Sequence, residues 1–163
     1  HGGEKFSRDF ILDPHNPQKP DTGYNWVRDI PTPTVNKIIE HYKDDYNIYQ
    51  IKSPTQKLLY KGAKPADNPI REIIALLLSS EKRILIDSFT QHMAAALGLN
   101  SKVLWIGTTP SNFGYKIHDN ILSNPYEFPP EYTLYHGFDL VEPISLMPYK
   151  SSGNIFDFNK IIK

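Results

Sequence analysis

Two short polar segments follow apolar runs, and their residue types suit the binding of an anionic ligand. One is Asp87-Ser88-Phe89-Thr90-Gln91-His92 after residues 84–86, and the other is Gly107-Thr108-Thr109 after residues 102–106. The first backbone N–H groups of a helix have no partner within the helix and carry the positive end of its dipole. A helix that begins at about Phe89 therefore offers a binding position for a phosphate or diphosphate, even without a basic side chain.

Two basic side chains add to this candidate site. His92 lies one turn into the expected helix, where it can donate to a phosphate oxygen or a sugar hydroxyl. Arg28, in the loop after the first expected strand, can supply the cationic contact that a diphosphate usually receives. The candidate binding residues are Asp87, Ser88, Phe89, Thr90, Gln91, His92, Gly107, Thr108, Thr109 and Arg28.

A purely structural explanation of the same residues stays open. Ser88 followed by Gln91 has the form of a capping box, which satisfies a helix N-terminus without any ligand. His92 is equally compatible with a partly buried structural role. What favours a site is the pair of polar strand ends facing one crevice.

The elements that must position these residues follow from the apolar pattern. Residues 84–86 form an apolar run typical of a buried parallel strand, the helix from Phe89 ends at Gly98, and Lys102–Ile106 forms the next strand. A crossover this short predicts parallel neighbouring strands, so both polar segments lie at the same carboxyl edge. Open α/β sheets bind their ligands at that edge.

The rest of the chain continues the same alternation. We expect strands at Asp9–Asp13 and Asn47–Ile51, and helices that start at Thr32-Pro33 and Asn68-Pro69 with the residue before each proline as N-cap. The expected loops are Pro14–Gly23 and Lys52–Asp67, and the second helix has an apolar stripe at Ile70, Ile73, Ile74, Leu77 and Leu78. The resulting order β-α-β-α-β-α-β predicts a Rossmann-like, doubly wound parallel α/β sheet.

We expect one domain, residues 9–163, with an irregular C-terminal tail from about residue 111. Within that tail, Tyr132–Tyr135 is a candidate short strand, and Asn154 is a candidate cap for a last helix with Ile155, Phe158 and Ile162 inward. Residues 1–8 are interpreted as a tag remnant or another artificial edge, so we expect the chain to be a piece of a larger protein.

Composition excludes several functional classes. Lys+Arg 18 and Asp+Glu 18 leave a formal net charge of +0, so no broad nucleic-acid-binding patch is expected. Nothing in the sequence resembles a signal peptide and no apolar run is as long as a membrane span, so we expect a cytoplasmic protein. The sequence has no cysteine, which excludes disulfides and thiolate metal sites. Four histidines show no ligand spacing, so we expect no metal site: His15, His41, His118 and His136. Walker and Gly-x-Gly-x-x-Gly sequences are also absent.

Residues 84–110 resemble a known family. The segments Asp87-Ser88-Phe89-Thr90-Gln91-His92-Met93-Ala94-Ala95-Ala96 and Gly107-Thr108-Thr109-Pro110 are similar to the Asp-Ser/Thr-Gly-x-x-His-x-Ala-Ala-Ala and Gly-x-Thr-x-Pro motifs of GT-B glycosyltransferases. The lipopolysaccharide heptosyltransferase type is most similar, specifically its C-terminal nucleotide-sugar-binding domain. A looser likeness covers residues 9–115, with Trp26 standing where the family has a Lys-x-Trp-Pro motif.

The resemblance implies a donor site and a reaction. The backbone amides of Ser88, Phe89 and Thr90 would hold the donor diphosphate, Asp87 and His92 would approach its sugar or phosphate, and Thr108 and Thr109 would line the crevice. The reaction would be an inverting, metal-independent transfer of a sugar to a hydroxyl of an acceptor such as a glycan, with the nucleotide-sugar as substrate and no cofactor. The family places the acceptor on an N-terminal domain, so we expect this chain alone to be inactive.

Three positions differ from the family pattern. Phe89 stands in place of its glycine, and Tyr24 in place of the lysine before the tryptophan. Residues 52–56 lack its acidic residue for the ribose. The residues alone also leave two alternatives open, a nucleotide-sugar 2-epimerase of the same fold and a non-catalytic module that binds a nucleotide or a protein. They identify neither the donor, nor the acceptor, nor a catalytic base.

Overall fold

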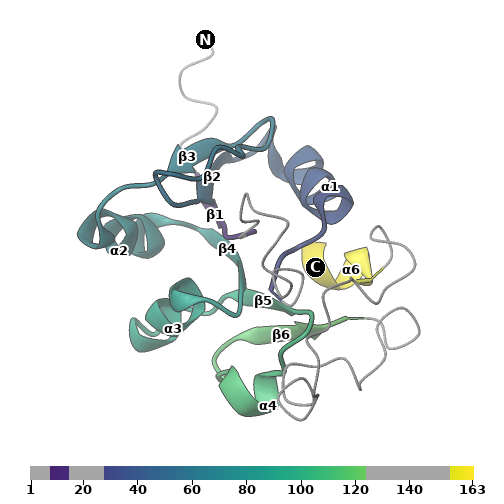
Figure 1. The fold of residues 1–163 in the computed structure, drawn as a ribbon. Helices are drawn as coiled ribbons and strands as arrows, with labels where there is room; N and C mark the ends of the chain where they lie inside the picture. Colours follow the sequence, from purple (N-terminus) through teal and green to yellow (C-terminus); the bar gives the residue numbers. More distant parts are fainter. Residues whose placement is uncertain (1–7, 15–27, 124–154) are drawn as a thin grey trace.

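Six parallel strands form one sheet in the order β3-β2-β1-β4-β5-β6 (Figure 1). The computed structural model describes residues 8–14, 28–123 and 155–163. The strands are β1 (Asp9–Leu12), β2 (Asn47–Ile51), β3 (Lys64–Ala66), β4 (Lys82–Ile86), β5 (Lys102–Trp105) and β6 (Asp119–Leu122). The helices are α1 (Thr32–Tyr42), α2 (Ile70–Ser79), α3 (Phe89–Ala96), α4 (Pro110–Phe113) and α6 (Phe158–Ile162). The predicted Rossmann-like, doubly wound parallel sheet is confirmed.

Helices cover both faces of the sheet (Figure 1). Alternate residues of the central strands point to opposite faces, so Phe10 and Leu12 pack with α1 and α6, whereas Ile11 packs with α2 and α3. In β4, Ile84 and Ile86 face the first layer and Leu85 faces the second. Burial on both faces explains why these strands are continuous apolar runs.

Two of the six strands, β3 and β6, were not predicted from the sequence. β3 lies inside the expected loop Lys52–Asp67, and β6 lies inside the expected irregular tail. Each is at one end of the sheet and buries only one of its residues, Ala66 and Ile121 respectively. Such strands are held by backbone hydrogen bonds to a single neighbour, so they need no apolar pattern of their own.

Both proline-led helices differ from the prediction by one residue: α1 begins one residue earlier and α2 begins one residue later. Pro31, rather than Thr32, occupies the N-cap of α1, and Pro69, rather than Asn68, occupies the N-cap of α2. Both prolines have extended ψ angles, 139° and 153°, and neither cap has a side-chain hydrogen bond. Proline has the right φ to lead into a helix and has no N–H to satisfy, which suits it to this position.

The apolar stripe of α2 covers less of the sheet than predicted. Ile73 and Leu77 are buried, but Ile70 and Leu78 are about half exposed, at 51% and 53%. The two buried residues are four apart, so they lie on one face of the helix, where the partly buried Leu76 also packs against the core.

Part of the predicted C-terminal helix is confirmed. Ile155 is buried, and Phe158 and Ile162 pack against the core. The cap of α6 is Asp157, whose side chain accepts from the Asn159 amide at 3.1 Å. Residue 154, predicted as the cap, and the candidate strand at residues 132–135 lie outside the described residues, as does most of the loop predicted at residues 14–23.

Candidate functional site

Three neighbouring strands bring polar residues to one edge of the sheet. β4 pairs in parallel with β1 on one side and with β5 on the other. Asp13 directly follows β1, Asp87 directly follows β4 and Thr108 lies three residues after β5, and all three are buried. The prediction that residues 87–92 and 107–110 follow parallel neighbouring strands is confirmed.

Asp13 connects β1 to the start of α3. Its Oδ2 accepts hydrogen bonds from the hydroxyls of Ser88 and Thr90, and its backbone N–H donates to Ile84 at 3.0 Å. Asp13 is 3% exposed, so these hydroxyls replace the water that a carboxylate requires. Asp13 is not among the predicted site residues, although it follows a strand at the same edge.

Asp87 lies between two basic side chains. Its Oδ2 is 3.8 Å from Nε of Arg28, and its Oδ1 is 3.9 Å from Nε2 of His92. The carboxylate is only 6% exposed, whereas Arg28 and His92 are 50% and 45% exposed. The structure therefore brings Arg28, from a distant part of the chain, to the predicted site residues Asp87 and His92, with the two basic groups on the solvent side.

The predicted capping box at α3 is wrong in one half. Ser88 is the N-cap, and its Oγ accepts from the Thr90 amide at 3.3 Å. Gln91 does not reach back to the cap. Its Nε2 donates instead to the carbonyl of Phe113 at 3.1 Å, because Gln91 is fully buried and faces the segment after β5.

Buried polar atoms remain without a partner beside this edge. Among the residues that the structure describes, they are Oε1 of Gln91, Oγ1 of Thr108 and Nδ1 of His118. An unpaired buried polar group costs about 1–3 kcal/mol. Gln91 and Thr108 therefore have unused hydrogen-bonding capacity, and both are predicted site residues.

The other predicted residues lie along the same two segments. Phe89 is the first residue of α3 and its side chain is 46% exposed. Gly107 is buried, and Thr109 is the N-cap of the one-turn helix α4, where its Oγ1 lies 3.0 Å from Oγ of Ser111.

His118 supports α3 from the side of β6. Its Nε2 lies 2.9 Å from the backbone carbonyl of Gln91, so the ring donates there. Burial lowers the pKa of His118 below its usual 6.5, and the nearby charges of Arg83 and His92 act in the same direction, while the hydrogen bond to Gln91 opposes them. A neutral ring that carries its proton on Nε2 satisfies this arrangement.

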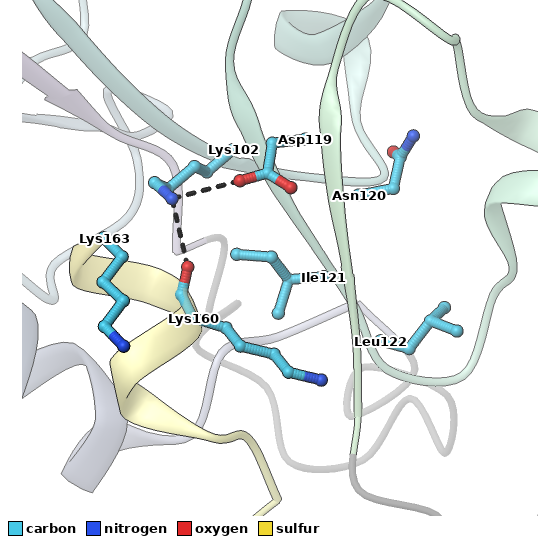
Figure 2. Close-up of a pocket in the computed structure, with 7 residues that line it drawn as sticks. All are labelled: Lys102, Asp119, Asn120, Ile121, Leu122, Lys160 and Lys163. Carbon is cyan, nitrogen blue, oxygen red and sulfur yellow. Dashed lines mark hydrogen bonds and ion pairs between the residues drawn. The ribbon is translucent and has the colours of Figure 1, made fainter.

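A cavity of about 400 Å³ lies elsewhere, between β6 and α6 (Figure 2). It is lined by Lys102, Asp119, Asn120, Ile121, Leu122, Lys160 and Lys163, none of which belongs to the carboxyl-edge site. Lys102 donates to Asp119 at 3.1 Å and to the carbonyl of Lys160 at 3.0 Å, so it joins the two elements. These contacts describe a packing junction at the side of the sheet.

Within residues 8–14, 28–123 and 155–163, no group of three or more acidic or histidine side chains is placed to hold a metal ion. In the same ranges, no helix has both the length and the apolar character needed to cross a membrane.

The fold is similar to part of a known enzyme. No family model matches the chain, and no curated protein matches its sequence. Among solved structures, E. coli heptosyltransferase WaaC with ADP matches with a TM-score of 0.56 and 13% sequence identity. The match covers 72% of this chain but only 38% of that protein, so this chain corresponds to one half of a GT-B structure. At this identity the comparison establishes the fold.

Proposed function

We propose that this chain is the nucleotide-sugar-binding domain of a glycosyltransferase, with its donor at the carboxyl ends of β1, β4 and β5. The observation that carries the proposal is the placement of Arg28 and His92 at 3.8 and 3.9 Å from the buried Asp87, beside the start of α3. The solved structure with the similar fold contains ADP, which supports a nucleoside diphosphate as the ligand class.

The diphosphate would bind at the N-terminus of α3. The amides of Phe89 and Gln91 belong to its first turn, where N–H groups point out of the helix toward an anion. Arg28 and His92 would add charge-assisted hydrogen bonds. Asp87 holds these two groups near the helix start, and the guanidinium of Arg28 offsets the repulsion that the carboxylate exerts on a phosphate on the solvent side.

The hydroxyls of Ser88 and Thr90 are not free to donate to such a ligand. Both donate to the Asp13 carboxylate, so their protons point into the protein. Contacts to phosphate oxygens would therefore come from backbone N–H groups and basic side chains. Of the three amides predicted to hold the diphosphate, that of Ser88 donates to the Ile86 carbonyl at 2.8 Å and that of Thr90 to Oγ of Ser88 at 3.3 Å, so the proposal keeps only that of Phe89.

The sugar would lie toward β5. Thr108 and Gln91 each have a buried side-chain oxygen without a partner among the described residues. Hydroxyl groups of a sugar can both donate and accept, so they would satisfy these atoms and remove the cost of leaving them unpaired. Gly107 and Thr109 would complete this wall of the crevice.

The reaction would be an inverting displacement at the anomeric carbon. An acceptor hydroxyl forms the new C–O bond while the bond from the anomeric carbon to the diphosphate oxygen breaks, and the nucleoside diphosphate leaves with its electron pair. Arg28, His92 and the α3 amides would stabilise the charge that develops on that leaving group. The acceptor, such as a glycan, and the base that removes its proton would come from a second domain.

Calorimetry with uridine, guanosine and adenosine diphosphates, with and without a chelator, tests the proposal. At least one nucleotide should bind, and chelation should leave its affinity unchanged because the proposed contacts are amides and basic side chains. Chemical-shift mapping should place the changes in residues 87–92 and 107–110. No binding, or shifts confined to α6, would contradict the proposed site.

A transfer assay tests the division of labour. This chain by itself should bind the nucleotide but transfer no sugar, and it should gain transferase activity when joined to an acceptor domain. Steady turnover by the chain alone would contradict the domain assignment. Epimerisation of the donor would favour the 2-epimerase alternative.

A further inference from the structure

Tyr115 is in direct contact with His92. The Tyr115 hydroxyl lies 2.9 Å from Nδ1 of His92, and the two rings meet edge to face with their centroids 5.5 Å apart. On the opposite side of the imidazole, Nε2 is 3.9 Å from Oδ1 of Asp87. The two ring nitrogens therefore face different partners, a phenol and a carboxylate.

Tyr115 is itself held in place by β6. Its backbone carbonyl accepts from Nδ2 of Asn120 at 3.0 Å, and Oδ1 of Asn120 accepts from Nε1 of Trp105 at 2.9 Å. Its ring also meets that of His118 edge to face, 6.0 Å away. Because Trp105 is 1% exposed, these two hydrogen bonds connect the backbone of Tyr115 to the buried core of the sheet.

These contacts determine where the His92 ring carries its proton. A carboxylate beside Nε2 favours N–H at that atom. A phenol can either donate or accept, so it can donate to Nδ1 of a neutral ring and accept from Nδ1–H of a charged one. The amide nitrogen of Gln91 lies 3.4 Å from Nδ1 and 3.3 Å from Nε2. One of its two N–H groups donates to the Phe113 carbonyl, and the other is about equally far from both ring nitrogens, so Gln91 favours neither tautomer.

We propose that Tyr115 is a positioning residue that keeps the His92 ring protonated on Nε2, so that His92 always presents a donor to the crevice. The distance of 3.9 Å between Nε2 and Asp87 exceeds a hydrogen bond, so the N–H can turn to a ligand oxygen beside the carboxylate. The part of this inference that concerns ligand binding rests on the proposed function. The tautomer itself does not.

The tautomer can be measured without any ligand, by long-range ¹H–¹⁵N correlation spectra of the histidine rings. The His92 signals are assigned by their loss in His92→Gln. The neutral ring of the native chain should show N–H at Nε2, and Tyr115→Phe should shift the ring toward the Nδ1–H form. His118, which donates to the Gln91 carbonyl, is the internal control and should keep its tautomer.

A second measurement connects the tautomer to binding. For the nucleoside diphosphate that the native chain binds, Tyr115→Phe should weaken affinity about 3- to 10-fold, the effect of one impaired hydrogen bond. Unchanged thermal melting would show that the variant folds, since Tyr115 is 41% exposed.

The outcomes separate the two proposals. A native His92 ring with N–H at Nδ1, or a tautomer that Tyr115→Phe leaves unchanged, overturns the positioning role. If the tautomer changes as expected but the native chain binds no nucleotide, the positioning role stands and the proposed function fails. If nucleotides bind and the tautomer changes but affinity does not, the role of His92 as a ligand donor is overturned.

Discussion

Nε of Arg28 lies 3.8 Å from Oδ2 of Asp87, although 59 positions separate the two residues in the chain. Arg28 precedes α1 and Asp87 follows β4, so only the parallel pairing of β1 with β4 brings them to one edge. The arginine is half exposed and the carboxylate is buried. This geometry directs a positive group to the mouth of the candidate site.

Arg28→Ala should therefore weaken nucleoside diphosphate binding about 10-fold, since one charge-assisted contact is lost. Stability should change by less than about 1 kcal/mol because the ion pair is half exposed and longer than a direct hydrogen bond. Arg71→Ala removes an exposed arginine of α2 and is the matched control. Equal losses in the two variants, measured by calorimetry, would indicate a general charge effect and not a site contact.

Asp13→Ala should destabilise the fold by about 2–4 kcal/mol. It removes the buried acceptor of the Ser88 and Thr90 hydroxyls and leaves both donors without a carboxylate. Thr90→Val keeps the volume and removes one of these donors. In denaturant melts the double variant should be less destabilised than the sum of the two single variants, because they disrupt the same interaction. Strict additivity would mean that Asp13 and Thr90 are not coupled.

Gly98→Val should cost roughly 1 kcal/mol or more of stability. Gly98 has φ +71°, and its N–H and that of Leu99 donate to Ala95 and Ala94 at 3.0 and 2.9 Å, which closes α3 as predicted. A Cβ at this position meets nothing within 4 Å, so the cost comes from the backbone alone. Gly98→Asn, which tolerates this conformation better, should cost less in the same melts. Identical melting of the native chain and Gly98→Val would contradict the strained-cap explanation.

The stability of the chain should fall as pH decreases below about 6.5, partly through His118. The pKa of this ring is lowered in the folded state, so the unfolded chain binds the proton first. The stabilisation that the neutral His118 ring contributes to the folded state is fully present above the ordinary pKa of 6.5. It is lost as the pH falls from there, and the loss is complete below the lowered pKa of the folded state. His118→Gln should show a weaker loss between pH 7.5 and 5.5. A loss equal to that of the native chain would assign the effect to other groups.

The sequence alone determined the features that depend on neighbouring residues. The apolar run before Asp87, the serine that caps α3 and the glycine that ends it are short-range signals, and they predicted a strand, a helix and their shared carboxyl edge. The α/β class followed from the alternation of these units. The binding roles of the residues at this edge remain predictions.

Only the tertiary structure decided which distant groups meet there. β3 and β6 depend on backbone hydrogen bonds to a neighbouring strand, which leave little trace in their own residues. The contacts of Asp13 with Thr90 and of Tyr115 with His92 also leave no trace in the sequence, because the two residues of each pair belong to different elements that are far apart in the chain. A sequence pattern reports the burial and the local conformation of a residue, whereas hydrogen bonds and ion pairs across a sheet edge depend on how the strands are ordered in space.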